Sequence, residues 1–268
     1  MANTTRFTKM HGCGNDYIYV DIRKYPIQSP EATSIIWSDR HKGIGGDGLV
    51  LIGSSEKADY SMRIFNSDGL EARMCGNASR CVAKFLYDNG DLKKEEFTLE
   101  TLSGIISLKI QVKDSMVESV TVDLGKPVEI KEVDLGEKYP FNGIAVNMGN
   151  PHLVILVDDL NEIDLSRWGS RLEYHPLFPD RINVEFAQVI NNNTIRMRVW
   201  ERGSGITQAC GTGASATVVA ASYMGKAAPQ SNVIMDGGML KIEWDKPSGS
   251  VYMIGPAITA YEGEVPTP

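Results

Sequence analysis

Two stretches of the chain share the same order of small, apolar and glycine positions. Residues 209–225 (ACGTGASATVVAASYMG) place a cysteine first, then small residues, then an apolar run before Gly225. Residues 74–90 (MCGNASRCVAKFLYDNG) repeat this order from Cys75 to Gly90. A periodic apolar segment that stops at glycine predicts a helix. Because the first turn carries little bulk, its unpaired backbone N–H groups can approach an anionic ligand closely.

Most other apolar positions fall in short runs between turn residues, which predicts strands. Residues 30–40, which begin with proline, and residues 160–172 favour helices. The expected strands are 17–22, 49–52, 60–65, 97–100, 105–112 and 117–124, followed by 128–133, 144–147, 153–157, 182–190, 195–201, 233–235, 240–244 and 251–254. Because strands outnumber helices and each half has one principal helix, we expect mixed sheets of the α+β class.

The two helical stretches belong to a longer internal repeat. Their cysteines lie 135 positions apart (210 − 75), and their stop glycines keep the same offset (225 − 90). Asn15 and Asn150, each after a glycine, also differ by 135. Since 135 is about half of 268 residues, the pattern indicates a duplicated unit. We expect two pseudo-symmetric halves, each a mixed sheet or barrel wrapped around a central helix, with the active site in the cleft between them.

The expected boundaries are 1–124 for the first half and 125–256 for the second. The tail, 257–268, is expected to return to the first half as an extra strand.

Composition and charge exclude several classes of protein. The net charge of −7 argues against nucleic-acid binding, and no apolar run is long enough for a membrane span. The N-terminus does not resemble a signal peptide, so a reducing cytoplasm is the expected compartment. The four cysteines have no CxxC spacing, which argues against a disulfide framework or structural zinc. The glycine-rich loop 43–48 lacks a GxxxxGK[ST] pattern, so we discount nucleotide binding.

Two cysteines at helix starts suit the inversion of a carbon acid. A helix N-terminus favours the thiolate, which brings a thiol toward the range useful for acid–base chemistry at neutral pH. One thiolate removes the α-proton from one face, and the other thiol donates a proton to the opposite face. Backbone N–H groups would stabilise the carbanion, so we expect neither metal nor pyridoxal phosphate nor any other cofactor. Cys13 and Cys81 are interpreted as packed residues.

The chain resembles the diaminopimelate epimerase family in seven segments that occur in family order. The segments are MHGCGNDYIYVD (10–21), GIGGDG (43–48), RIFNSDG (63–69), MCGNASRC (74–81), MGNPH (148–152), RINVEF (181–186) and ERGSGITQACGTGA (201–214). The resemblance implies conversion of LL-2,6-diaminopimelate to the meso form without pyridoxal phosphate, an isomerase reaction of lysine and peptidoglycan precursor synthesis. It also implies two similar halves with the active site between them, and it favours a homodimer.

The resemblance assigns roles to individual residues. Cys75 and Cys210 are the proton-transferring thiols. The reacting carboxylate would receive N–H groups from Gly76, Asn77, Gly211 and Thr212, and Asn15 and Asn150 would line the pocket. A clamp for the distal amino-acid group would consist of Asn66, Asn183, Glu201 and Arg202. His152 has two interpretations, a packed or hydrogen-bonded residue or a catalytic one.

Two departures from the family pattern bear on substrate choice. Gly48 stands where many members carry glutamine, and Ile206 where many carry glutamate. A racemase of another amino acid, such as histidine, is therefore the nearest alternative. A dehydratase relative is disfavoured because we expect such proteins to lack one of the two thiols. A non-catalytic amino-acid-binding or redox-sensing protein is the alternative from a different class.

Overall fold

The computed structural model describes residues 4–267, which divide into two compact units. One unit runs to Val122 and resumes at Gly255, and the other spans Asp123–Ile254. The sequence places the corresponding boundaries after residues 124 and 256. Residues 1–3 and 268, which the expected first half and its tail include, lie outside the described residues.

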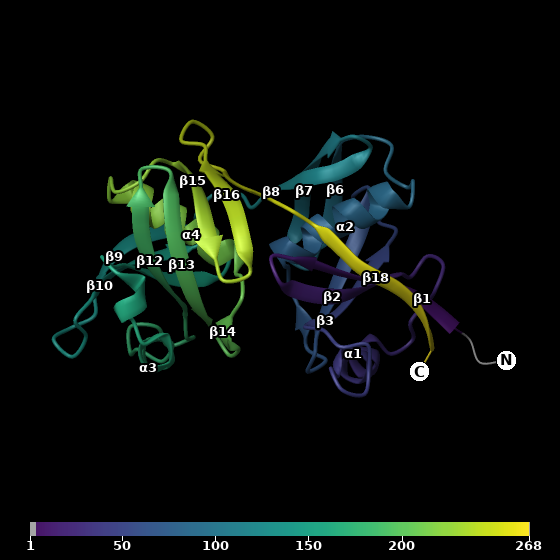
Figure 1. Ribbon diagram of the computed structural model, residues 1–268, viewed down its shortest axis with the longest axis horizontal. Coiled ribbons are helices and arrows are strands. Elements are labelled where there is room, and N and C mark those ends of the chain that lie inside the picture. The colour runs from purple at the N-terminus through teal and green to yellow at the C-terminus, as the bar shows by residue number, and fades with distance from the viewer. Residues whose placement is uncertain (1–3, 268) are drawn as a thin grey trace. The chain divides into compact units, whose positions relative to one another are not determined.

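The first unit is a mixed sheet with two helices. Its strands are β1 (Thr4–Gly12), β2 (Asn15–Asp21), β3 (Gly48–Gly53), β4 (Tyr60–Asn66), β5 (Glu71–Ala72), β6 (Glu96–Thr101), β7 (Gly104–Lys113), β8 (Met116–Asp123) and β18 (Ile258–Pro266), and its helices are α1 (Pro30–Ser38) and α2 (Gly76–Asp88) (Figure 1). Hydrogen-bonded neighbours follow the order β18-β1-β2-β3-β4-β6-β7-β8, with β5 beside β4. The pairs β2–β3 and β4–β6 are parallel, and the others are antiparallel.

The second unit has the same topology. Its strands are β9 (Glu129–Asp134), β10 (Asn142–Asn147), β11 (Pro151–Leu156), β12 (Asn183–Asn191), β13 (Thr194–Glu201), β14 (Gly205–Thr207), β15 (Gln230–Met235), β16 (Gly238–Trp244) and β17 (Val251–Gly255), and its helices are η1 (Leu160–Glu162), α3 (Leu165–Leu172) and α4 (Gly211–Tyr223). The order is β9-β10-β11-β12-β13-β15-β16-β17, with β14 beside β13. The parallel pairs are β11–β12 and β13–β15, the counterparts of those in the first unit.

The elements keep the offset found in the sequence. Helix α4 begins and ends 135 residues after α2 (211 − 76 and 223 − 88), and α3 begins 135 residues after α1 (165 − 30). The predicted α+β fold of two pseudo-symmetric halves is therefore confirmed. The tail strand β18 pairs with β1 as β9 pairs with β10, so the chain's C-terminal segment completes the first unit's sheet.

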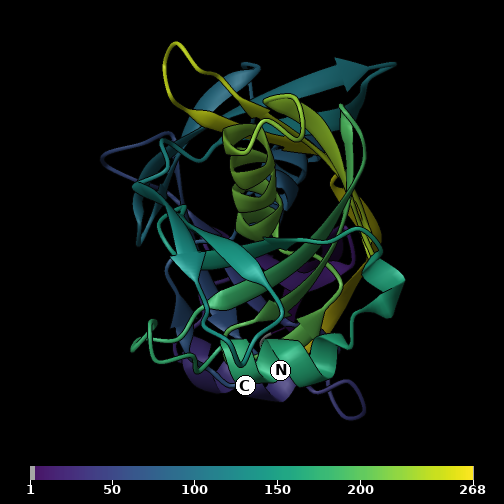
Figure 2. The same ribbon diagram turned by 90° about the vertical axis from the view of Figure 1, so that its left-hand side faces the viewer.

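Helix α4 lies inside the curved sheet of its own unit (Figure 2). It contacts strands β10, β11, β12, β13, β15 and β16. Val218, Val219, Ala220 and Ala221 are fully buried, as are most of the small residues before them. A helix buried on all sides carries apolar or small residues all round, which is why this segment shows no polar face. Helix α2 occupies the equivalent place and contacts β1, β2, β7 and β18.

A second layer of apolar packing covers the other face of each sheet. In the first unit, Trp37 of α1 clusters with Leu49 and Leu51 of β3. Val50 and Ile52, which alternate with these two leucines along β3, are equally buried. Because successive side chains of a strand point to opposite faces, a strand covered on both faces is apolar throughout. In the second unit, Leu165 and Leu172 of α3 form the corresponding cluster with β11 and β12. No helix in the described chain has both the length and the apolar character needed to cross a bilayer.

The predicted helix over 160–172 is wrong as one element. The segment forms η1 and then α3, separated by Ile163 and Asp164. Asp159 accepts a hydrogen bond from the Asn161 N–H, and Asp164 accepts one from the Arg167 N–H. Each aspartate is thus an N-cap, and a second N-cap starts a new helix instead of continuing the first.

Substitution Gly169→Ala tests the contact between α3 and β13. A β-carbon at position 169 would lie 2.5 Å from Cβ and 2.6 Å from Cγ of Trp200, next to the backbone of a strand. Overpacking of this kind costs about 1–3 kcal/mol. We therefore expect a lower urea midpoint by circular dichroism. Ser166→Ala, at an exposed position of the same helix, is the matched control and should change stability by less than about 0.5 kcal/mol. Equal midpoints for both variants would contradict this account of the packing.

Candidate active site

Cys75 is the N-cap residue of α2, with extended backbone angles (φ −141°, ψ 115°). Its thiol donates to Oδ1 of Asn15 at 3.4 Å, and Nδ2 of Asn77 donates to the same oxygen at 3.3 Å. Cys75 and Asn15 are half-buried, whereas Asn77 is buried. The structure thus brings together, at the start of α2, three residues that the sequence analysis selected.

Asp47, in the glycine-rich loop, fixes the orientation of the Asn15 amide. Its Oδ2 accepts from Asn15 Nδ2 at 2.8 Å and from the Asp16 N–H at 3.0 Å. Arg40 holds this loop by ion pairs to Asp47 (2.9 Å) and Asp16 (2.7 Å). A carboxylate only accepts hydrogen bonds, so the NH2 group of Asn15 faces Asp47 and its carbonyl oxygen faces the thiol.

Asp16 is held as a carboxylate within this network. Burial opposes its ionisation, but hydrogen bonds from Arg40 and Lys9 outweigh burial and lower the pKa of Asp16. The Lys9 ammonium is itself buried and lies 2.6 Å from an Asp16 oxygen. Charged groups of both signs therefore stabilise the loop that positions Asn15.

Cys210 is the N-cap residue of α4, also with extended angles (φ −127°, ψ 111°). Its sulfur accepts a cap hydrogen bond from the Gly213 N–H at 3.4 Å and lies 3.6 Å from the Thr212 hydroxyl, whereas the Cys75 side chain forms no cap hydrogen bond. Asn150 donates to that hydroxyl at 3.2 Å. The two helix starts are thus equivalent in backbone position and different in hydrogen-bond direction.

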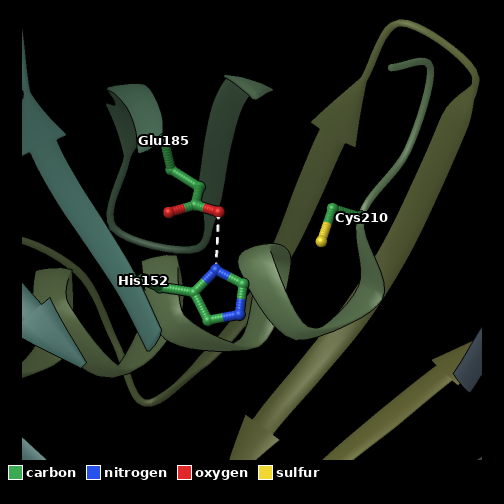
Figure 3. A group of neighbouring side chains, drawn as sticks. All are labelled: His152, Glu185 and Cys210. Carbon is green, nitrogen blue, oxygen red and sulfur yellow. Dashed lines mark hydrogen bonds and ion pairs between the residues drawn. The ribbon is translucent and has the colours of Figure 1, made fainter. Parts of the chain in front are cut away.

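Three acidic or basic side chains lie near Cys210, and Figure 3 shows two of them, His152 and Glu185. His152 of β11 and Glu185 of β12 are fully buried, and His152 Nδ1 lies 2.7 Å from Glu185 Oε1. Glu201, at the end of β13, accepts a hydrogen bond from the Thr207 hydroxyl (2.5 Å), and its charge acts on Cys210. A β-carbon on Gly213 would lie 2.6 Å from Glu185 Oε1 and 3.3 Å from the Cys210 sulfur, so glycine at this position lets the carboxylate approach the thiol.

The expected acidification of Cys210 is wrong in this environment. Burial raises the pKa of Cys210 well above its usual range, and the charges of Glu201 and Glu185 raise it further. Hydrogen bonds from Thr212 and Gly213 lower the pKa of Cys210, but burial and the two charges outweigh them. The residue is 6% exposed, so the desolvation of a thiolate outweighs the helix N-terminus. Burial also raises the pKa of the Glu201 carboxyl.

The four residues expected to form a distal clamp differ in exposure and in hydrogen-bond partners. The Asn183 amide is buried, donates to the Pro151 carbonyl at 2.8 Å and accepts from the Arg202 N–H at 2.9 Å. The exposed Arg202 guanidinium donates to the Asp180 carbonyl at 3.0 Å. Asn66 ends β4, where its carbonyl accepts from Ser34 at 2.8 Å. Glu201 lies beside Cys210, as described above.

The sequence analysis did not select Asp47 or Glu185 as site residues. Both stand inside the quoted segments GIGGDG and RINVEF. A signal for Glu185 was its place as a lone charge in an apolar strand, since buried charges are paired. At position 48, where many family members carry glutamine, a β-carbon would lie 2.1 Å from the Phe65 carbonyl oxygen. The backbone therefore accommodates only glycine here. Ile206, the other departure, is exposed in β14.

Solved structures share this fold at low sequence identity. A predicted epimerase from Pseudomonas aeruginosa superposes with a TM-score of 0.77 at 16% identity, covering 98% of this chain and 100% of that one. A phenazine biosynthesis protein of the PhzF family from Bacillus anthracis has a TM-score of 0.76 at 18% identity, covering 98% and 99%.

Sequence comparisons give a closer relationship. The family profile described as Diaminopimelate epimerase matches residues 7–130 and 144–260. A diaminopimelate epimerase of Bacteroides thetaiotaomicron is 57% identical over 99% of both chains, and one of Methanococcus maripaludis is 47% identical over 97% of this chain and 99% of that protein. A profile match in both units and such identity along nearly the whole chain show that it belongs to the diaminopimelate epimerase family.

Proposed function

We propose that this chain is an isomerase that converts LL-2,6-diaminopimelate to the meso form with Cys75 and Cys210 as its two proton-transferring groups. The observation that carries the proposal is the equivalent placement of both cysteines as N-caps of the two enclosed helices. High identity to proteins named diaminopimelate epimerase supports the choice of substrate.

The reaction breaks one C–H bond and forms another on the same α-carbon. A thiolate on one face takes the α-proton and becomes a thiol. The thiol on the opposite face gives its proton to the carbanion and becomes a thiolate, so protons and charge balance and the configuration inverts. In the reverse direction the two cysteines exchange roles. Each is matched to proton transfer because the thiol is the side chain whose ordinary pKa lies closest above neutrality.

Backbone N–H groups at the helix starts would bind the α-carboxylate and stabilise the developing negative charge. Gly76 and Asn77 begin α2, and Gly211 and Thr212 begin α4, where the first-turn N–H groups have no partner within the helix. Such donors favour anions, and fixed dipoles stabilise a carbanion without reorganisation. Asn15 and Asn150 would complete the polar lining of the two helix starts.

Cys210 would begin the reaction as the acid. Its burial beside Glu201 and Glu185, and the resulting raised pKa, favour the neutral thiol at physiological pH. Cys75 is half-buried and would begin as the base. The electrostatic effect of Glu201 on Cys210 supports a role at the reacting centre, in contrast to the distal role that the resemblance implied. Arg202 would bind the distal carboxylate of the substrate. Asn183 would hold the backbone of Arg202. Asn66 would contact the same distal group of the substrate. His152 would hold Glu185 in position beside Cys210.

The cellular location, the oligomeric state and the partners of the protein are also proposals. Free cysteines at both helix starts require a reducing environment, which supports a cytoplasmic location. The homodimer, and action without nucleic acid or membrane, stay predictions. A racemase acting on histidine or another amino acid is the second candidate, because position 48 lacks the glutamine of many family members.

Incubation of the reduced protein with LL-diaminopimelate in deuterium oxide tests the proposal. We expect meso product that carries one solvent deuterium at the inverted carbon, measured by chiral chromatography and mass spectrometry. Cys75→Ala and Cys210→Ala should each abolish the conversion, because each thiol serves one face. Cys81→Ala, a buried thiol on α2 that is not an N-cap, is the matched control and should retain conversion.

Failure of the folded, reduced protein to convert or exchange LL-diaminopimelate would contradict the substrate assignment. Exchange with histidine or another amino acid instead would favour the racemase. Full conversion by either the Cys75→Ala or the Cys210→Ala variant would contradict the two-thiol route.

Substitution Arg202→Ala tests the distal carboxylate site. A substrate carboxylate that loses its guanidinium partner costs about 1.5–3 kcal/mol, so we expect kcat/KM to fall about 10- to 100-fold, mainly through KM. Arg202→Lys should recover only part of this loss because it lacks the forked geometry. Arg198→Ala, which removes an arginine paired with Asp236 in the same unit, is the control. An unchanged kcat/KM for Arg202→Ala would remove this residue from the site.

Substitution Glu201→Gln tests the electrostatic account of Cys210. Removing the Glu201 charge should lower the pKa of Cys210, because that charge raises it. The pH midpoint for alkylation of Cys210 by iodoacetamide, followed by peptide mass spectrometry, should therefore move to lower pH. Asp236→Asn, which removes a carboxylate paired with Arg196 and Arg198, should leave the midpoint in place. If both variants gave the same midpoint as the unmodified protein, Glu201 would not control the thiol.

A further inference from the structure

His152, Glu185 and Cys210 converge within the second unit from three different elements (Figure 3). One ligand atom of each residue, a ring nitrogen, a carboxylate oxygen and the sulfur, lies within 4.8 Å of the other two. All three side chains are buried. The sequence analysis expected no metal. These three residues lie far apart in the chain and match no spacing motif.

Two of the buried polar atoms in this cluster form no hydrogen bond within the described residues. His152 Nε2 and Glu185 Oε2 have no hydrogen-bond partner among the described residues, although the other nitrogen and oxygen of the pair are bonded to each other. Buried polar atoms in folded proteins are nearly always satisfied, and an exception indicates strain, a catalytic role or a ligand. Here both exceptions lie in the group that also contains the thiol.

The charge of the cluster favours a cation. Glu185 and Glu201 both act on Cys210 as negative charges. Within residues 4–267, no lysine or arginine forms an ion pair with either glutamate, and the partner of Glu185 is His152. A site that holds two carboxylates beside a thiol disfavours a thiolate but attracts a dication, whose charge offsets both.

We propose that His152, Glu185 and Cys210 form a binding site for Zn²⁺, which inhibits the protein when occupied. Sulfur, imidazole nitrogen and carboxylate oxygen together are the donor set that Zn²⁺ prefers over Mg²⁺ or Ca²⁺. Tetrahedral zinc needs these donors about 3.4–3.6 Å apart, given bond lengths of about 2.0–2.3 Å. The ligand atoms of the present group lie within 4.8 Å of one another, so zinc would need shifts of up to about 1 Å in these side chains.

Binding and inhibition are separate consequences of this site. On binding, the Cys210 thiol releases its proton to solvent and the sulfur becomes a zinc-bound thiolate. Such a sulfur has no proton to donate and is less basic than a free thiolate, so it cannot serve the second face of the substrate. The inhibition therefore rests on the proposed function, whereas the binding rests on the side chains alone.

Titration of the full-length reduced protein with Co²⁺ tests the site without reference to activity. A thiolate ligand gives a near-ultraviolet charge-transfer band, and tetrahedral coordination gives intense visible bands. We expect both bands to saturate at one equivalent and to disappear on addition of Zn²⁺. Cys210→Ser should lose the charge-transfer band, and the isosteric Glu185→Gln should weaken Zn²⁺ binding at least about 10-fold. Cys75→Ser, which alters the cysteine of the other unit, is the matched control and should keep the band.

Circular dichroism of each variant checks that a lost band does not reflect unfolding. Absence of saturable Co²⁺ binding would overturn the proposal, as would a band that persists in Cys210→Ser. Zn²⁺ should also abolish epimerisation, with recovery on addition of EDTA; saturable Zn²⁺ binding with full activity would overturn the inhibition. A Co²⁺ band in a protein that never converts diaminopimelate would instead leave the site standing and contradict the proposed function.

Discussion

The rest of the structure depends on the enclosure of a helix within each curved sheet. Strands on all sides of α4 leave room only for small and apolar side chains, so residues such as Ala214, Ala216 and Ala220 have no exposed surface. The first turn consequently has no bulky side chain in front of its N–H groups, and the residue that caps it must also be small. A cysteine in extended conformation meets that requirement and places a thiol at the start of the helix. The packing of the core and the chemistry of the site therefore have one cause.

The duplication reproduces backbone positions but not their electrostatics. At the offset of 135, Glu185 corresponds to Val50 (185 − 50), Glu201 to Asn66 and His152 to Tyr17. Every ionisable group around Cys210 thus has an uncharged counterpart in the first unit. There, the Cys75 thiol donates to the Asn15 carbonyl oxygen, which Asp47 turns toward it. A helix N-terminus favours a thiolate by up to about 2 kcal/mol. Desolvation and two carboxylates outweigh that preference at Cys210.

The sequence was sufficient for features that depend on periodicity and repetition. The offset of 135 located both enclosed helices, and the apolar runs located the strands, because burial on both faces leaves a continuous pattern such as that of Leu49 to Ile52. The division of one helical segment into two helices was harder to predict. Residues 160–172 have helical periodicity, but Asp159 and Asp164 each cap a separate helix. The sign of the pKa shift at Cys210 was not predictable at all. It depends first on the burial of the thiol and then on the charges of Glu201 and Glu185. Glu185 lies near the thiol because strand pairing places β12 beside β11 and Gly213 leaves room.

Unequal surroundings for the two thiols have a direct consequence for a two-base inversion. Such a reaction needs one thiolate and one thiol at the same time. If both cysteines had the same independent pKa, at most half of the molecules would hold one proton between them, and these would divide equally between the two arrangements. Burial and the two carboxylates near Cys210 favour the arrangement with the proton on Cys210. Under the proposed reaction, the divergence of the second unit thus selects which thiol is the acid. The same carboxylates make that thiol the one that a dication would bind.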